Sequence, residues 1–296
     1  MQSTIENIKP DNTDFRSLAR ALTIVENDLT GAADILKSLE FNKESRVVGV
    51  TGPPGAGKST LVNGLISRLL TNGNTVAILA IDPTSPFNFG SLLGDRIRMA
   101  SHFNHPDVFI RSLATRGSLG GLSAKTIEMT DVLRASGFDY ILIETVGVGQ
   151  SEVEIAGLAD ITLLVLVPES GDDIQNIKSG LMEIADAFIV NKADREGADL
   201  FANNLKKILT HKKGDVTPVF KTNATSGEGL NAVVNFIQSS PNLKRKRKEI
   251  LLAEKAYQII RQKYMAGIDK KKLSHDIAIA LSDPDFNLYK FIERYV

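Results

Sequence analysis

The stretch Gly52-Pro53-Pro54-Gly55-Ala56-Gly57-Lys58-Ser59-Thr60 decides the fold of this chain of 296 residues. It follows the short apolar run Val47–Val50 and opens the helix-period stretch Ser59–Leu70. The spacing G-x-x-x-x-G-K-[ST] between a strand and a helix is typical of a phosphate-binding loop. Its glycines let main-chain amides turn inward around phosphate oxygens, and the start of the helix adds partial positive charge. We therefore predict that the whole stretch binds a nucleoside triphosphate, with Lys58 at the β- and γ-phosphates and the Ser59 hydroxyl on Mg²⁺.

Apolar runs alternate with helix-period stretches along the middle of the chain. The predicted strands are Val47–Val50, Val76–Ile81, Val108–Ile110, Tyr140–Ile143, Ile161–Val167, Ala187–Val190 and Val216–Phe220. The predicted helices are Ser59–Leu70, Leu122–Ala135, Ile174–Ile184, Leu200–Leu209 and Leu230–Ile237. Continuous apolar strands indicate a sheet buried on both faces, with parallel strands joined by crossover helices. We predict an α/β fold of the P-loop NTPase type, with a doubly wound, mostly parallel sheet over residues 46–240.

Helical extensions flank this domain. Residues 1–45 carry one apolar helical face, followed by a second short helix; the face consists of Leu18, Ala21, Leu22, Val25 and Leu29. Residues 241–296 carry the basic run Lys244–Lys248, a long helix and two further short helices. Both extensions have too little apolar surface to fold alone, so we expect them to pack on the α/β domain or on another copy of the chain. The apolar stripe Ala253–Tyr264 fits either arrangement.

A second motif indicates which base the nucleotide carries. Asn191-Lys192-Ala193-Asp194 follows the strand Ala187–Val190, as the N-K-x-D motif of GTPases does. A carboxylate in the base plane accepts hydrogen bonds from both N1–H and the N2 amine of guanine, whereas adenine would leave it unpaired. We predict that Asn191, Lys192 and Asp194 bind guanine, with Asn223, Ala224 and Thr225 in the loop that lines the base.

Carboxylates at the ends of predicted strands indicate a metal site. Glu144 and Gly147 follow the strand Tyr140–Ile143, where many GTPases carry Asp-x-x-Gly; Asp82 ends another strand, and Asp95 lies further on. Ligands of open α/β sheets bind at this edge, and Mg²⁺ takes one or two carboxylates beside phosphate oxygens. We predict a Mg²⁺ site formed by Ser59, Asp82, Asp95 and Glu144. One carboxylate then binds through water or in only one nucleotide state. The Gly147 amide is suited to the γ-phosphate, whose loss would release its loop.

The residue that orients the attacking water in Ras-like enzymes has no direct counterpart. Val148 stands where those enzymes place glutamine, and Gln150 lies two residues further on. We therefore expect slow intrinsic GTP hydrolysis that rises when a partner completes the site. Arg98, Arg116 and Lys178 are the candidate groups for stabilising the developing charge.

The composition excludes several classes of protein. The chain has no cysteine, which rules out disulfides, zinc–thiolate sites and a thiol nucleophile. Its 35 basic and 35 acidic residues balance, which argues against nucleic acid as a main partner. Without a presequence or a long apolar run, we expect a cytoplasmic protein with no membrane partner. The pair His102 and His105 lacks a third ligand, so we expect a solvated loop there.

Several further motifs carry a family resemblance. They are Leu18-Ala-Arg-Ala-Leu-Thr23, Ile81-Asp-Pro-Thr-Ser-Pro86, Leu93-Gly-Asp95, Arg116-Gly-Ser-Leu-Gly-Gly-Leu122, Glu144-Thr-Val-Gly-Val-Gly-Gln-Ser151 and Gly171-Asp-Asp-Ile-Gln-Asn-Ile-Lys178. With the phosphate loop and Asn191–Asp194, they closely resemble the methylmalonyl-CoA mutase-associated GTPases, a family also labelled arginine/ornithine transport ATPase. The resemblance covers residues 15–240, and the C-terminal helices are similar to the family's dimerisation arm in pattern.

The resemblance implies a homodimeric GTPase chaperone of an adenosylcobalamin-dependent acyl-CoA mutase, which gates cofactor loading and protects the mutase. A cobalamin adenosyltransferase is a further candidate partner. By position, Lys58, Ser59, Asp82, Asp95 and Glu144 resemble the family's phosphate and Mg²⁺ residues, and Glu169–Lys178 resembles a segment that senses the mutase. The chain departs from the family at Phe87-Asn-Phe-Gly90, which bears on the identity of the mutase.

Two alternatives stay open at this stage. One is a nucleotide-dependent kinase or ATPase of an amino-acid transport system, which an Asp194→Asn change would barely affect. The other is a metallochaperone, which stoichiometric binding of Ni²⁺ or Zn²⁺ would support.

Overall fold

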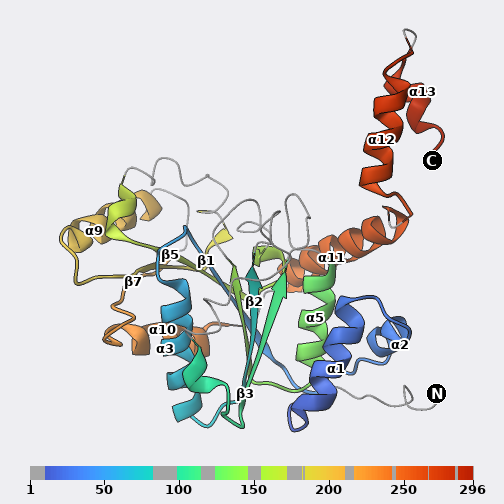
Figure 1. Ribbon diagram of the computed structural model, residues 1–296. Helices are drawn as coiled ribbons and strands as arrows, with labels where there is room; N and C mark the ends of the chain where they lie inside the picture. Colours follow the sequence, from blue (N-terminus) through green and yellow to red (C-terminus); the bar gives the residue numbers. More distant parts are fainter. Residues whose placement is uncertain are drawn as a thin grey trace. The chain divides into compact units, whose positions relative to one another are not determined.

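A computed structural model gives the structure of the chain (Figure 1). It describes residues 11–82, 99–114, 124–145, 155–171, 182, 184–210, 217–241, 245–265, 267–283 and 286–295. The chain divides into two compact units, Met1–Lys248 and Glu249–Val296. The sequence-based divisions after residues 45 and 240 stay predictions.

The first unit is built on one seven-stranded sheet. Its strands are β1 (Arg46–Thr51), β2 (Val76–Asp82), β3 (Val108–Ala114), β4 (Tyr140–Thr145), β5 (Ile161–Leu166), β6 (Ala187–Val190) and β7 (Val219–Lys221). The strand order is β3-β2-β4-β1-β5-β6-β7, and every neighbouring pair is parallel. The predicted α/β fold with a doubly wound parallel sheet is therefore confirmed. The strand order reverses direction at β1, which is where ligands of such sheets bind.

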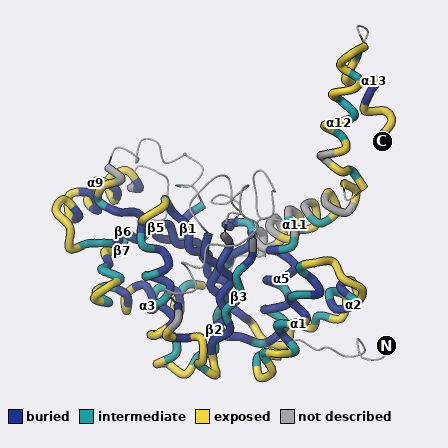
Figure 2. Tube along the Cα trace, in the orientation of Figure 1, coloured by how far each residue is buried: buried dark blue, intermediate teal, exposed yellow. Residues whose placement is uncertain are grey.

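Helices cover both faces of the sheet. Those of the first unit are α1 (Phe15–Glu26), α2 (Ala32–Lys37), α3 (Lys58–Thr71), α5 (Ala124–Ala135), α9 (Ala198–Thr210) and α10 (Leu230–Ser239). In Figure 1, α3 and α10 lie together on one face, and α5 lies with α1 on the other. Figure 2 shows the strands between them in the dark blue of buried residues.

The strand β5 shows how the two faces share the core. Leu163 and Val165 belong to the apolar cluster formed with α3 and α10, whereas Leu164 and Leu166 belong to the cluster formed with α9. Successive side chains of a strand point to opposite faces, so a strand buried on both faces needs an unbroken apolar run. The sequence of β5 has that run, and all six of its residues are buried.

Two strand boundaries differ from the sequence-based prediction by three residues or more, and several others differ by one or two. Strand β3 continues from Val108 to Ala114, beyond the predicted end at Ile110. The polar residues Arg111 and Ser112 end the apolar run, but among the described strands β3 pairs with β2 only and lies at the edge of the sheet. Arg111 forms an ion pair with Glu26 and also donates to the hydroxyl of Thr23 on α1. Strand β7 begins only at Val219, directly after Pro218.

The N-terminal helices pack on the α/β domain, one of the two arrangements expected from the sequence. The Asp14 side chain caps α1 by accepting from the main-chain amides of Arg16 and Ser17. Helix α1 buries Leu18, Ala21, Leu22, Ile24 and Val25 and contacts α5. The rings of Phe15 and of Phe109 on β3 form an edge-to-face pair, with 5.5 Å between ring centroids.

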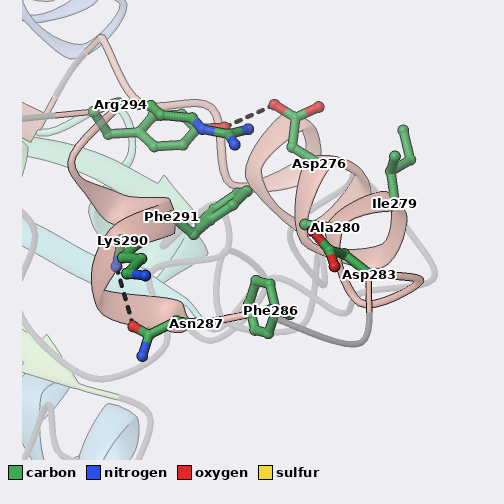
Figure 3. A pocket seen from close by; sticks show the side chains of 10 residues that line it. Asp276, Ile279, Ala280, Asp283, Phe286, Asn287, Lys290, Phe291 and Arg294 are labelled. Carbon is green, nitrogen blue, oxygen red and sulfur yellow. Dashed lines mark hydrogen bonds between the residues drawn. The ribbon is translucent and has the colours of Figure 1, made fainter.

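The second unit consists of most of α11 (Arg245–Met265), α12 (Lys270–Ala280) and α13 (Leu288–Ile292). A cavity of 540 Å³ lies between α12 and the segment that carries α13, with Phe286 and Phe291 among its lining residues (Figure 3). The Tyr295 hydroxyl donates to the Asp276 carboxylate at 2.7 Å, which raises the pKa of that phenol. None of the described helices in either unit combines the length and the apolar character that a membrane span needs.

Candidate functional site

The phosphate-binding loop lies between the carboxyl end of β1 and the first residue of α3. Helix α3 begins at Lys58, one residue earlier than predicted, with Gly57 as its N-cap. Lys58 is buried, with 6% of the residue exposed, and its ammonium donates to the carbonyls of Gly52 at 2.8 Å and Pro53 at 3.0 Å. The cation is thus held over the loop, at the place where phosphate oxygens bind in this type of fold.

The structure brings together two of the predicted metal ligands. The Ser59 hydroxyl, at the start of α3, donates to the Glu144 carboxylate at the end of β4 over 2.6 Å. Both side chains are buried, with 5% of each residue exposed. Their meeting follows from the sheet, because β1 and β4 are paired neighbours with Val50 beside Glu144. A hydroxyl and a carboxylate are hard oxygen ligands of the kind Mg²⁺ prefers, so this pair fits that ion.

Asn191 ties together the three loops around the predicted base site. Its amide nitrogen donates to the carbonyl of Ala56 in the phosphate loop at 2.9 Å. Its amide oxygen accepts from the Thr222 hydroxyl and from the main-chain amide of Ala224, both at 3.1 Å. The side chain is buried, with 2% of the residue exposed. The predicted contact of Asn191 with the base stays a prediction; in this structure its side chain also joins the walls of the cavity to each other.

Close packing against Asn191 explains a glycine of the phosphate loop. Gly57 has φ +86°, and a Cβ atom there would lie 2.4 Å from the Asn191 amide nitrogen. A side chain would therefore be strained by its backbone conformation and would also displace Asn191.

A cavity of 290 Å³ gathers the predicted base-binding residues. Its lining comes from three segments that are far apart in the sequence: Gly57 and Thr60; Asn191, Lys192, Asp194 and Arg195; and Asn223, Ala224 and Thr225. The sequence placed all of these except Arg195 in the nucleotide site. Arg195 directly follows the N-K-x-D motif, and that adjacency is the one signal that pointed to it.

Arg195 also connects the cavity to the segment after β5. It forms an ion pair with Glu169, whose side chain is about half exposed. The hydrogen bond from Arg195 holds the pKa of the Glu169 carboxyl below its usual value. Glu169 begins the segment that the family resemblance implies to sense a partner.

Several predicted site residues lie outside the described part of the chain. They are Asp95, Gly147 and Lys178, together with Arg98, Arg116, Val148 and Gln150 and the stretch 87–90. Asp82 ends β2 as predicted, but its side chain is not described. Their roles stay predictions.

The expectation of a solvated loop at His102 was wrong. His102 is buried, with 8% exposed, in a short helical turn (Ala100–His102), and its Nε2 lies 3.2 Å from the Ser67 hydroxyl on α3. Burial lowers the pKa of its imidazole. The lack of a third ligand argued against a metal site at His102, but it does not show whether the imidazole ring turns inward. His105 is half-buried, and its Nδ1 accepts from the amide of Asp107.

Replacing the side chain of Asn191 tests its structural role. We expect Asn191→Ala to lower the free energy of unfolding by about 2–4 kcal/mol, because it leaves buried polar groups at Ala56 and Thr222, and the half-buried amide of Ala224, without this partner. Urea unfolding of the ligand-free protein measures the change. Asn203→Ala, an exposed position on α9, is the matched control and should stay within about 0.5 kcal/mol of wild type. An equal effect of both substitutions would contradict the role of Asn191.

Comparisons with known proteins agree with this geometry. The family model described as methylmalonyl Co-A mutase-associated GTPase MeaB matches residues 18–272. A relative from Pyrococcus horikoshii, whose name includes the word GTPase, is 46% identical over 288 residues, covering 93% of this chain and 88% of the relative. The mouse protein named methylmalonic aciduria type A homolog, mitochondrial, is 36% identical over 235 residues, covering 72% and 57%. The solved structure of an LAO/AO transport system kinase matches with a TM-score of 0.68 over 99% of this chain and 98% of that one; at 23% identity, this likeness concerns the fold.

Proposed function

Because the chain belongs to the methylmalonyl Co-A mutase-associated GTPase family, we propose that it is the G-protein chaperone of an adenosylcobalamin-dependent acyl-CoA mutase. As a member of this family, it is a GTP hydrolase that forms GDP and phosphate. In the proposed role, the chain gates the loading of the mutase with its cofactor and protects the mutase from inactivation. Hydrolysis of GTP sets the duration of each cycle.

The observation that best supports binding of a guanine nucleotide is the cavity lined by Gly57, Asp194 and Thr225. The phosphate loop lies at one end of this cavity, and Asp194 is exposed on its wall. A base bound there has its phosphates directed toward Lys58 and the start of α3. The Asp194 carboxylate accepts from N1–H and the N2 amine of guanine, and no equivalent donor pair exists on adenine.

Mg²⁺ is part of this proposal. The Ser59 hydroxyl and the Glu144 carboxylate would hold it, with Asp82 and Asp95 as further ligands, and the ion would neutralise the charge on the phosphate oxygens. The hydrogen bond from Ser59 to Glu144 supports the assignment, because it keeps both oxygens at the end of the phosphate loop before nucleotide arrives. In the same proposal, the Gly147 amide contacts the γ-phosphate and Lys178 stabilises the developing charge.

Partner sensing rests on the segment Glu169–Lys178. Glu169 is joined to Arg195 on the wall of the base cavity, so the segment starts at a residue that contacts the nucleotide site. We place the mutase at this segment. The chain acts as a homodimer through residues 241–296 in this proposal, and a cobalamin adenosyltransferase is a further partner. The proposed dimer contact is supported by exposed apolar residues on α11, among them Tyr257, Ile260 and Tyr264, which a second copy of the chain would cover.

Stimulation by the partner tests the proposed function. We expect GTP turnover by the purified chain to rise about tenfold or more on addition of the cobalamin-dependent acyl-CoA mutase of the same organism, because the partner completes the hydrolytic site. Phosphate release measures the rate, and light scattering of the complex measures how many copies of the chain it holds. A cobalamin-independent acyl-CoA enzyme is the control. Unchanged turnover with every cobalamin mutase of the organism would contradict the chaperone role.

A further inference from the structure

We propose that Arg68 is a positioning residue for recognition of the nucleotide base, because its guanidinium holds the turn 222–229 that forms one wall of the base cavity. The inference rests on the proposed guanine-nucleotide function and deepens it. Arg68 lies on α3, the helix that starts at Lys58, and it is half-buried. It does not line the cavity itself.

The guanidinium of Arg68 joins three separate parts of the first unit. Its Nη2 donates to the carbonyl of Gly227 at 2.7 Å, in the turn that follows β7. Its Nε donates to the side-chain oxygen of Asn231 on α10 at 2.8 Å, and its Nη1 donates to the carbonyl of Gly64 on α3 at 3.2 Å. All three acceptors are neutral, so the rigid fork of the guanidinium, rather than an ion pair, fixes the geometry.

The turn is shaped to receive this group. Gly227 has φ +83°, and a Cβ atom there would lie 2.5 Å from Nη2 of Arg68. Within the turn, the Asn223 side chain accepts from the amides of Thr225 and Ser226, and the Gly227 amide donates to the carbonyl of Asn223. These local hydrogen bonds fix the conformation of the turn, but they do not fix its place beside the cavity.

Contacts from outside the turn hold it at its two ends. On the cavity side, Asn191 accepts from the amide of Ala224 and from the Thr222 hydroxyl, and Thr222 also makes main-chain hydrogen bonds with Val190 and Ala193. On the other side, Arg68 holds Gly227. Since Ala224 and Thr225 line the cavity between these contacts, loss of Arg68 frees one end of the wall that meets the base. The phosphate loop has its own contacts through Lys58 and Asn191, which do not involve Arg68.

Because the contacts of the base wall and of the phosphate loop are separate, the role of Arg68 can be measured by comparing GDP with tripolyphosphate, which has no base. Arg68→Met keeps the apolar stem and removes the donors. We expect it to raise the Kd for GDP about tenfold while the Kd for tripolyphosphate stays within about twofold of wild type. The KM for GTP should rise by a similar factor, with kcat unchanged at saturating GTP. Isothermal titration calorimetry and phosphate release give these values.

Three further variants keep the test decisive. Arg68→Lys retains the charge without the fork and should raise the Kd for GDP about threefold, which also carries the test should Arg68→Met fold poorly. Asn231→Ala leaves the contact between Arg68 and Gly227 in place and should raise the Kd for GDP about twofold. Arg20→Met, an exposed position on α1, is the control and should bind GDP as wild type does.

The outcomes separate this inference from the function on which it rests. If Arg68→Met weakened the binding of GDP and of tripolyphosphate equally, Arg68 would have a general structural role and the inference would be overturned. An unchanged Kd for GDP would overturn it as well, with the proposed function intact. Wild-type protein that binds no GDP would overturn both.

Discussion

Lys58→Ala should lower kcat/KM for GTP about 10²- to 10³-fold and leave the chain folded. The ammonium of Lys58 is the buried cation of the phosphate loop, held by the carbonyls of Gly52 and Pro53. When phosphates bind, it exchanges these neutral acceptors for charged oxygens, and this interaction strengthens as charge develops on the transferred group. Alanine supplies no charge, and no other residue of the loop carries one.

Phosphate release at several GTP concentrations measures this effect, and thermal unfolding checks that the variant is folded. Lys37→Ala is the matched control, because Lys37 is exposed at the end of α2. Its kcat/KM should equal that of wild type. A Lys58→Ala variant with more than a tenth of wild-type kcat/KM would contradict the assignment of the phosphate site.

Asp194→Asn should weaken GDP binding about 10²- to 10⁴-fold and strengthen binding of xanthosine diphosphate. Each hydrogen bond from the base to a carboxylate contributes about 1.5–3 kcal/mol, and guanine offers two donors to Asp194. An asparagine amide brings a donor where guanine presents its N2 amine, whereas xanthine carries a carbonyl oxygen at that position and accepts from the amide. The base preference should therefore change while the phosphate contacts stay the same.

Competition of GDP, ADP and xanthosine diphosphate for a fluorescent nucleotide measures the preference. Glu196→Gln removes another exposed carboxylate two residues away and should leave all three affinities unchanged. The same experiment decides against the transport kinase or ATPase alternative, because an enzyme that uses ATP would barely respond to Asp194→Asn. Equal affinity of the wild type for GDP and ADP would contradict guanine recognition.

Most residues that line the proposed base cavity were named from the sequence, because their motifs lie directly after apolar runs. A parallel sheet brings the ends of its strands to one edge, so Ser59, Glu144 and Asp194 could be assigned to that edge from the order of strands and motifs alone. The confirmed sheet and the cavity around Gly57, Asp194 and Thr225 have the same origin.

Contacts to the main chain were not predictable in this way. Arg68 binds the carbonyls of Gly227 and Gly64, and a carbonyl has no sequence signal of its own. The hydrogen bonds of Asn191 to Ala56 and Ala224 were missed for the same reason. The predicted strand ended before Arg111 because this residue is charged. In the structure β3 continues through Arg111, since this edge-strand residue forms an ion pair with Glu26 on the neighbouring helix α1.

The different roles of Asn191 and Asp194 within the N-K-x-D motif have an evolutionary consequence. Asn191 joins three loops, whereas in the proposed function Asp194 recognises the base, so we expect the two positions to be under different selective constraints. A descendant that switched to another nucleotide would change Asp194 first and would retain Asn191, since altering Asn191 disturbs three loops at once. Divergence in ligand choice is therefore open to single substitutions, provided that they spare Asn191.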